Sequence, residues 1–150
     1  MREKIIFIVA IQVCFAVQVF GQEVKQKEVP SIILNGFKQL FPKAEDIEWK
    51  LKNGTYYVDF ETKFSKTQKA WFNKTGKMVR HIQSVFQSDL PQKVSATLKK
   101  EYEKYRIDEI KKVFTDSKIT YLIELRRKKE EINLVMSEDG FILDKKIDTD

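Results

Sequence analysis

Hydrophobic residues along the chain first recur with the spacing of a helix and then alternate with polar residues as strands do. After Pro30 the apolar positions lie on one helical face, at Ile33, Phe37, Leu40 and Phe41. Pro30 suits the first position of a helix because it has no backbone N–H to leave unsatisfied there. Pro42 ends the stretch, since a proline disfavours helical geometry in the residue before it. The pattern predicts a helix over residues 30–41.

Alternating segments after this helix predict a small antiparallel sheet. Strands are expected over residues 47–51, 56–60, 69–73 and 78–86. Asn53-Gly54 is a strong hairpin signal between the first two strands, because both residues tolerate positive φ. Since side chains alternate across a strand, Val58 and Phe60 are expected to face the helix and Tyr57 to face away from it.

The same order of elements recurs roughly 60 residues later, which indicates an internal repeat. Leu90-Pro91 opens a second stretch with helical spacing, at Val94, Leu98 and Tyr102. Strands are expected over residues 107–113, 121–126, 132–136 and 141–147. We therefore predict an α+β fold, a tandem repeat of a helix packed on a four-stranded antiparallel sheet, with units at residues 29–88 and 89–150.

The N-terminal segment is typical of a secretory signal peptide over residues 1–21. Arg2 and Lys4 precede a largely apolar run that ends at Phe20. A membrane anchor is the alternative, but the run is shorter than the ~20 residues that span a bilayer. We expect cleavage after Gly21, a flexible lead-in over residues 22–28 and a periplasmic or secreted bacterial protein with no stable membrane span.

Composition narrows the chemistry available to the exported chain. The only cysteine, Cys14, lies in the apolar run, so the mature chain has no disulfide, thiolate nucleophile or cysteine-based metal site. The only histidine, His81, lies in an expected strand, and no serine sits in a glycine-flanked nucleophile motif. We expect no catalytic residue, no cofactor and no metal site. The net charge of +6 indicates either solubility or attraction to an anionic surface.

One pair of carboxylates is compatible with an enzymatic function. Asp59 and Glu61 project from the same face of one expected strand and would suit acid–base hydrolysis of a glycan. Such residues are more often the solvated face of an antiparallel sheet.

Aromatic and charged side chains predict a recognition surface on the sheet face that the helix leaves open. The candidate residues are Tyr57, Asp59, Lys69 and Trp71. An exposed aromatic patch flanked by charge is typical of a binding site. The alternative is that Trp71 is covered by the other unit or by a dimer partner.

Basic residues near two hairpin tips predict a basic rim that could receive anionic glycans or lipid headgroups. These residues are Lys63, Lys66, Arg126, Arg127, Lys128 and Lys129. Solvated turn charge is the alternative reading. Nucleic acid is not expected as a partner, because an exported protein rarely meets it.

The chain resembles the exported PepSY-like family of Gram-negative bacteria, which is also described as β-lactamase-inhibitor-like. The resemblance rests on the Val-Pro helix that ends at Phe41-Pro42-x-Ala44, and on the order of the strand motifs that follow, Ile47-x-Trp49, Tyr56-x-Val58-x-Phe60, Ala70-x-Phe72 and the turn at Gly76. It covers residues 29–147 and implies an exported, two-layered α+β protein with the fold of a β-lactamase-inhibitor protein. It carries no catalytic motif.

Residues and resemblance together predict a non-enzymatic exported binding module that recognises a protein or an envelope glycan or lipid. One alternative is an inhibitor or chaperone-like regulator of an exported hydrolase. The other is a carboxylate-based glycan hydrolase that uses Asp59 and Glu61.

Overall fold

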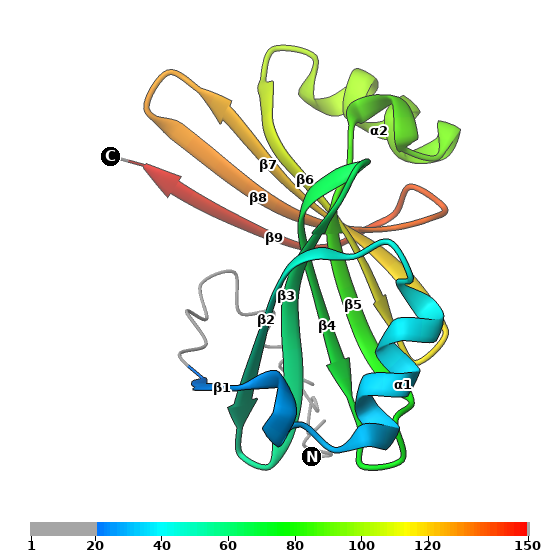
Figure 1. Cartoon of the computed structure of the whole chain (residues 1–150). Coiled ribbons are helices and arrows are strands. Elements are labelled where there is room, and N and C mark those ends of the chain that lie inside the picture. The colour runs from blue at the N-terminus through cyan, green and yellow to red at the C-terminus, as the bar shows by residue number, and fades with distance from the viewer. Residues whose placement is uncertain (1–20, 150) are drawn as a thin grey trace, which may run out of the picture.

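The computed structural model describes residues 21–149, which form one nine-stranded antiparallel sheet and two α-helices (Figure 1). The helices are α1 (Ser31–Leu40) and α2 (Gln92–Tyr102). The strands are β1 (Gln22–Val24), β2 (Glu45–Lys52), β3 (Thr55–Thr62), β4 (Ser65–Phe72), β5 (Met78–Ser84), β6 (Arg106–Thr115), β7 (Lys118–Arg127), β8 (Glu130–Ser137) and β9 (Ile142–Thr149). Each strand pairs with its neighbour in the chain, and the sheet twists so strongly that β9 crosses the direction of β2. The predicted α+β class with an antiparallel sheet is confirmed.

Both helices pack on the same face of this sheet. The ladder between β5 and β6 places His81 opposite Phe114. The His81 ring contacts the rings of Phe41 and Phe60, which belong to the packing around α1. Ile110 lies four residues before Phe114 on the same strand face and belongs to the core under α2. One sheet face therefore carries both helices, and we call the other the helix-free face.

The core under α1 is built around the Phe37 ring. Its centroid lies 5.4 Å from that of Trp49, 5.1 Å from that of Phe60 and 6.1 Å from that of Phe72, in edge-on geometry each time. Edge-to-face aromatic pairs add about 0.5–1.5 kcal/mol each beyond the burial of their area. Val58 and Phe60 face α1 as the alternation predicts.

The core under α2 is mainly aliphatic. Val94, Leu98 and Tyr102 of α2 pack on side chains from β6, β7 and β8, among them Ile110, Ile123, Leu125, Leu134 and Met136. Burying each such aliphatic side chain contributes about 1.5–3 kcal/mol. The two cores are separate, and the β5–β6 ladder joins their strands into one sheet.

Turn glycines let the sheet approach each helix closely. A Cβ on Gly76, in the turn between β4 and β5, would lie 2.4 Å from the carbonyl oxygen of Ile32 in α1. A Cβ on Gly140, in the turn between β8 and β9, would lie 2.5 Å from the carbonyl oxygen of Lys93 in α2. Both glycines have positive φ, +78° and +82°. Each turn therefore needs a residue without a side chain for two separate reasons.

Residues 22–28 do not form the expected flexible lead-in. Gln22 and Val24 pair with Leu51 and Trp49 as strand β1, and Gln26–Glu28 form a single 3₁₀ turn. Val24 packs against the core under α1, so this segment gains both ladder hydrogen bonds and apolar burial. The expected signal peptide lies outside the described residues, apart from Gly21. None of the helices in residues 21–149 is long and apolar enough to cross a membrane.

Candidate binding surface

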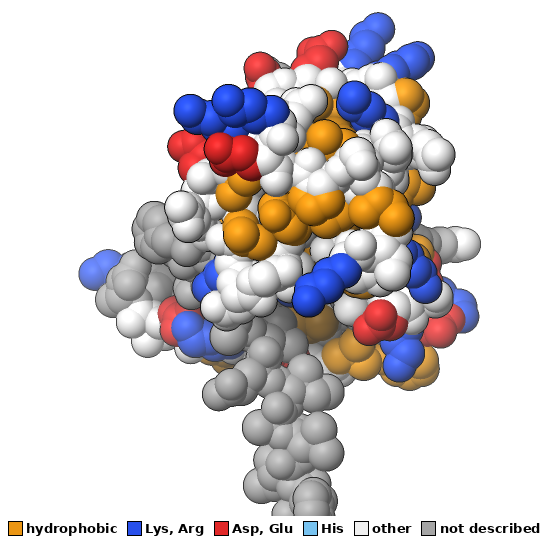
Figure 2. All heavy atoms as spheres, turned by 60° about the horizontal axis from the view of Figure 1, so that its bottom comes forward, with side chains coloured by type: hydrophobic (Ala, Val, Ile, Leu, Met, Phe, Trp, Pro, Cys, Tyr) orange, Lys and Arg blue, Asp and Glu red, His pale blue; other side chains and the backbone are white. Residues whose placement is uncertain are grey.

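A row of large side chains crosses the helix-free face over β3, β4 and β5. The strand registers place Tyr57 opposite Trp71, and Trp71 opposite Arg80. These residues alternate with Val58 and Ala70, which belong to the core under α1. The sequence prediction that Tyr57 and Trp71 share a face is therefore confirmed. Elsewhere on the molecular surface, seen with the bottom of Figure 1 turned forward, unlabelled hydrophobic side chains form a band with charged groups above and below it (Figure 2).

The two rings of this row stack, but they differ in exposure. The centroids of Tyr57 and Trp71 lie 5.9 Å apart with an interplanar angle of 24°. Tyr57 is only 1% exposed, and its hydroxyl accepts a hydrogen bond of 2.9 Å from the backbone N–H of Gly21. Trp71 is half-buried. The expectation that Tyr57 offers an exposed ring is therefore wrong for this structure, in which Gly21 and Lys69 lie against the tyrosine and Trp71 supplies the accessible aromatic area.

Two cations lie over these rings. The Lys69 Nζ atom lies 5.4 Å from the Tyr57 centroid and 6.0 Å from the Trp71 centroid. The Arg80 guanidinium carbon lies 5.0 Å from the Trp71 centroid. A cation over an aromatic ring is attracted by about 0.5–1 kcal/mol at an exposed site and by more when water is excluded. Arg80 is not predicted from the sequence, because its place opposite Trp71 depends on a register shift between β4 and β5 on the turn side of this pair.

Asp59 is held in an ion-pair network beside this row. One carboxylate oxygen lies 2.5 Å from Lys50 Nζ and the other lies 3.2 Å from Lys69 Nζ. The hydrogen bond from Lys50 to Asp59 raises the pKa of that lysine, against the opposing effect of its burial. Both oxygens of Asp59 are thus held in ion pairs with lysines. This arrangement does not favour the hydrolase reading, in which Asp59 acts with Glu61.

The predicted basic rim is divided between the two faces of the sheet. Arg126 lies on the helix-free face, where its guanidinium pairs with Asp108, Glu124 and Glu131. Arg127, next in the chain, points to the other side and lies 5.4 Å over the Tyr105 ring. Alternation along β7 separates the two arginines, and three carboxylates neutralise one of them. A single rim is therefore not formed at this tip.

The remaining rim residues lie in or beside turns. Lys63 lies in the turn between β3 and β4, Lys66 lies in β4, and Lys128 and Lys129 form the turn between β7 and β8. Lys63, Lys128 and Lys129 are exposed. Solvated turn charge accounts for these three side chains.

His81 does not join the helix-free face. Its ring packs between Phe41 and Phe60, with centroids 5.0 Å and 6.2 Å away, and its Nε2 lies 3.0 Å from Gln68 Oε1. The Gln68 amide nitrogen donates to Thr62 Oγ1 at 2.7 Å, so the amide oxygen faces the histidine and Nε2–H is the donor. Burial, helped by the charge of Lys112, lowers the pKa of His81 to about 4. The imidazole is therefore neutral at physiological pH.

Groups able to hold a metal ion are not clustered in the described part of the chain. Within residues 21–149, no three histidine, cysteine, aspartate or glutamate side chains come together as a metal site would require. The helix-free face instead offers aromatic area, cations and paired carboxylates, which suit recognition of another molecule.

Comparison with a protein-family model gives two overlapping matches, over residues 16–65 and 54–144. The model's description is "Putative beta-lactamase-inhibitor-like, PepSY-like". No curated protein sequence matches the chain.

Solved structures from Bacteroides species share the fold at low sequence identity. A BLIP-like protein from Bacteroides fragilis is 19% identical, with a TM-score of 0.67 over 81% of this chain and 87% of its own. A DUF2874 family protein from Bacteroides ovatus is 21% identical, with a TM-score of 0.67 over 79% and 86%. A structure named for "putative periplasmic proteins" from Bacteroides eggerthii is 16% identical, with a TM-score of 0.69 over 81% and 90%.

Proposed function

The chain belongs to the PepSY-like, β-lactamase-inhibitor-like family, and from this premise we propose that it is a non-enzymatic exported binding protein whose partner docks on the helix-free face around Trp71. The observation that carries the proposal is a half-buried tryptophan beneath the Arg80 guanidinium and beside Lys69. Tryptophan and arginine are the side chains that most often dominate the binding energy of protein interfaces. An exported location is supported by the N-terminal sequence and by the name of the structure from Bacteroides eggerthii.

The partner in this proposal is an exported protein or an envelope component that brings acidic groups to the site. Trp71 supplies apolar area, while Arg80 and Lys69 orient an approaching carboxylate. Tyr57 has a supporting role, because its buried ring fixes the plane of Trp71. Asp59 has the same kind of role for Lys69, which it holds beside the aromatic pair.

An internal duplication is part of the same proposal. Four strands follow each helix, and a turn glycine contacts each helix in the same manner. The two overlapping family matches are in keeping with a repeated unit. The aromatic row lies in the first half, whereas Arg126 and its carboxylates occupy the helix-free face in the second half. The two copies would thus carry different side chains on the helix-free face, while both keep a helix packed on four antiparallel strands.

The experiment compares capture of a partner by the wild-type protein and by two alanine variants. Each protein is immobilised and exposed to the exported fraction of the source cells, and bound material is quantified by mass spectrometry. We expect Trp71→Ala to reduce capture of a specific partner at least tenfold, which corresponds to about 1.4 kcal/mol. The control is Phe86→Ala, which removes an exposed ring outside the row and should leave capture unchanged.

Folding of both variants is checked by circular dichroism and urea unfolding. Trp71 is half-buried, so Trp71→Ala should lower the free energy of unfolding by about 1–2 kcal/mol and leave the fold intact. Equal capture by a folded Trp71→Ala variant would remove the proposal. An equal loss of capture in Trp71→Ala and Phe86→Ala would show that the partner does not bind specifically at the row around Trp71, which would contradict the proposal.

Regulation of an exported hydrolase is the second candidate, favoured by the family description and by the BLIP-like neighbour. It predicts that the captured partner is a hydrolase and that the purified protein lowers its activity in a dose-dependent manner. The Trp71→Ala variant should then need at least about tenfold more protein for the same inhibition.

A further inference from the structure

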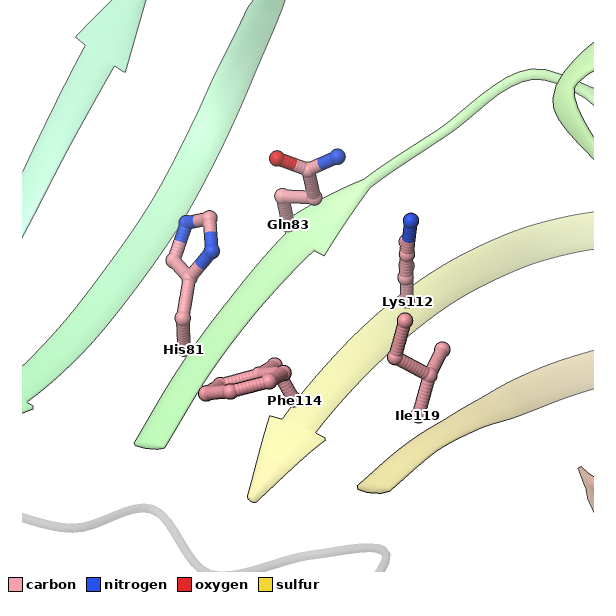
Figure 3. Close-up of a pocket in the computed structure, with 5 residues that line it drawn as sticks. All are labelled: His81, Gln83, Lys112, Phe114 and Ile119. Carbon is pink, nitrogen blue, oxygen red and sulfur yellow. The ribbon is translucent and has the colours of Figure 1, made fainter. Parts of the chain in front are cut away.

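A cleft lies on the helix-bearing face where the two halves of the sheet meet. Its smaller part has a volume of ≈ 210 Å³ and is lined by His81, Gln83, Lys112, Phe114 and Ile119 (Figure 3). Its larger part, of ≈ 460 Å³, shares Gln83 and Lys112 and extends between the end of α1 and the segment before α2. Pockets for small organic molecules typically measure about 300–1,000 Å³ and favour such junctions.

Polar groups gather at one place on the floor of this cleft. Figure 3 shows the polar ends of His81, Gln83 and Lys112 on the same side, above the apolar side chains of Phe114 and Ile119. Lys112 is half-buried and forms no ion pair with any carboxylate in residues 21–149. A half-buried ammonium group is most stable when an anion accompanies it.

The other charged groups of the cleft leave this positive charge uncompensated. Asp89 lines the larger part, but one of its carboxylate oxygens accepts a hydrogen bond of 2.9 Å from the backbone N–H of Phe86. Lys43 adds a second cation at the edge of the cleft. Since two lysines face one aspartate, the cleft carries a net positive charge.

Large apolar side chains stand exposed around the larger part of the cleft. Phe64 is 83% exposed and Leu40 is 51% exposed, and both line it together with Phe41 and Val85. Apolar groups gathered at the mouth of a pocket mark a site that gains free energy when a ligand covers them. The cleft therefore combines an apolar entrance with a cationic, amide-bearing end.

We propose that this cleft binds a small amphipathic carboxylate, whose carboxylate pairs with Lys112 and accepts from the Gln83 amide while its apolar chain covers Leu40 and Phe64. One half-buried lysine balances one negative charge, which favours a monoanion over a phosphate. This site is separate from the surface around Trp71, which lies on the other face of the sheet. The ligand class is either a free acyl carboxylate or the carboxyl end of an apolar peptide.

Calorimetric titration of the purified protein with four probes tests the ligand class. The probes are octanoate, octanol, acetyl-leucyl-phenylalanine and the C-terminal amide of that dipeptide. We expect at least one acid to bind about tenfold more tightly than its neutral counterpart, because only the acid pairs with the lysine. Preference for octanoate would identify an acyl carboxylate, and preference for the dipeptide acid would identify a peptide end. Equal binding of acids and neutral probes would overturn the proposal.

Variants of the cleft test the assigned residues. Lys112→Met should abolish the preference for the acid, and Lys112→Arg should keep it. The matched control is Lys100→Met, which removes an exposed lysine of α2 outside the cleft and should have no effect. Phe64→Ala should weaken binding of octanoate a few-fold without changing the fold, because this side chain is exposed. Equal binding by the two methionine variants would contradict the role of Lys112.

The single histidine gives an independent measure of where the probe binds. The imidazole NMR signals of His81 should shift when the preferred acid is added, because His81 lines the same cleft as Lys112. The Trp71→Ala variant should show the same shift, so the outcome does not depend on the function proposed for the helix-free face. Signals of His81 that stay unchanged at saturation would exclude this cleft as the site.

Discussion

His81 is kept neutral by the side chains packed around it. Its Nε2–H donates a hydrogen bond to the Gln68 amide oxygen, the Phe41 and Phe60 rings limit its contact with water, and Lys112 repels a second proton. Burial and the charge of Lys112 lower the pKa of His81 to about 4, below the ordinary value of 6.5. The fold thus favours the uncharged imidazole, and its stability depends on pH through this one side chain.

The stability contributed by neutral His81 should be lost as the pH falls. Above pH 6.5 the imidazole is neutral in both the folded and unfolded states, so the contribution is complete. Between pH 6.5 and about 4 the unfolded state binds a proton that the folded state does not, which lowers the free energy of unfolding by about 2–3 kcal/mol. Below pH 4 this loss stops growing.

Urea unfolding at pH 7.0 and pH 4.5 measures this effect by comparison with His81→Gln. The variant retains a hydrogen-bonding side chain but does not titrate, so the carboxylates that also titrate in this range cancel in the difference. The wild-type protein should lose about 2 kcal/mol more than the variant between the two pH values. Parallel losses in the two proteins would show that His81 is not desolvated.

Alternation along single strands predicts side-chain direction well but predicts exposure poorly. It placed Tyr57 and Trp71 on the helix-free face, because direction depends only on the backbone of each strand. It could not predict that Tyr57 is buried or that Arg80 covers Trp71, because both depend on side chains from other strands. Arg80 in particular reaches its position through a register shift that no local sequence pattern reveals.

At the scale of elements, two turn glycines dock the sheet against its helices. Gly76 has a φ of +78°, and a Cβ at this position would meet the carbonyl oxygen of Ile32 at 2.4 Å. Gly36 in α1 faces the same contact, since a Cβ there would lie 2.1 Å from the carbonyl oxygen of Gly76. The closeness of α1 to this turn therefore requires both glycines.

Alanine substitution separates the close contact from the backbone conformation. Gly54 has nearly the same φ, +75°, but a Cβ at Gly54 would meet nothing within 4 Å. Gly54→Ala should therefore lower the free energy of unfolding by about 1–2 kcal/mol, the cost of a left-handed alanine alone. Gly76→Ala should lower it by at least about 1 kcal/mol more, because the helix or the turn must also move.

Chemical unfolding of the two glycine variants under identical conditions makes this comparison. A loss at Gly76 no larger than the loss at Gly54 would mean that α1 adjusts to the added methyl group at no cost. The contact between this turn and α1 also shows what a local sequence pattern cannot predict. The glycine turn was expected from the sequence, but its contact with α1 arises only when the chain has folded back on itself.

At the scale of the molecule, two separate cores share one sheet. The cores under α1 and α2 have no buried residue in common, and the ladder from Arg80–Ser84 to Lys111–Thr115 connects them. The alternating pattern predicted strands in both halves, but whether the two sheets are continuous depends on pairing between distant segments. The β5–β6 ladder shows that the strands of the two halves form one continuous sheet.

A core substitution in the second half should be detected in the first half. Leu134 is fully buried under α2, so Leu134→Ala should lower the free energy of unfolding by about 2–5 kcal/mol. Both tryptophans, Trp49 and Trp71, lie in the first half and report its unfolding by fluorescence. If the shared sheet couples the halves, the fluorescence midpoint should fall with the midpoint measured by circular dichroism. A fluorescence transition that stays at its wild-type midpoint would show that the halves unfold independently.

Every ladder of the sheet joins strands that are consecutive in the chain, from β1–β2 to β8–β9. Six of these eight ladders are hairpins joined by short turns, whereas the β1–β2 and β5–β6 ladders each enclose a segment that contains one α-helix. None of the pairings closes a very long loop, so the entropic penalty of each is modest, which favours fast folding. In a chain released N-terminus first, six strands could pair as soon as the next strand follows, and only β1 and β5 would wait, with an unpaired edge, until a helix and then a strand had been released.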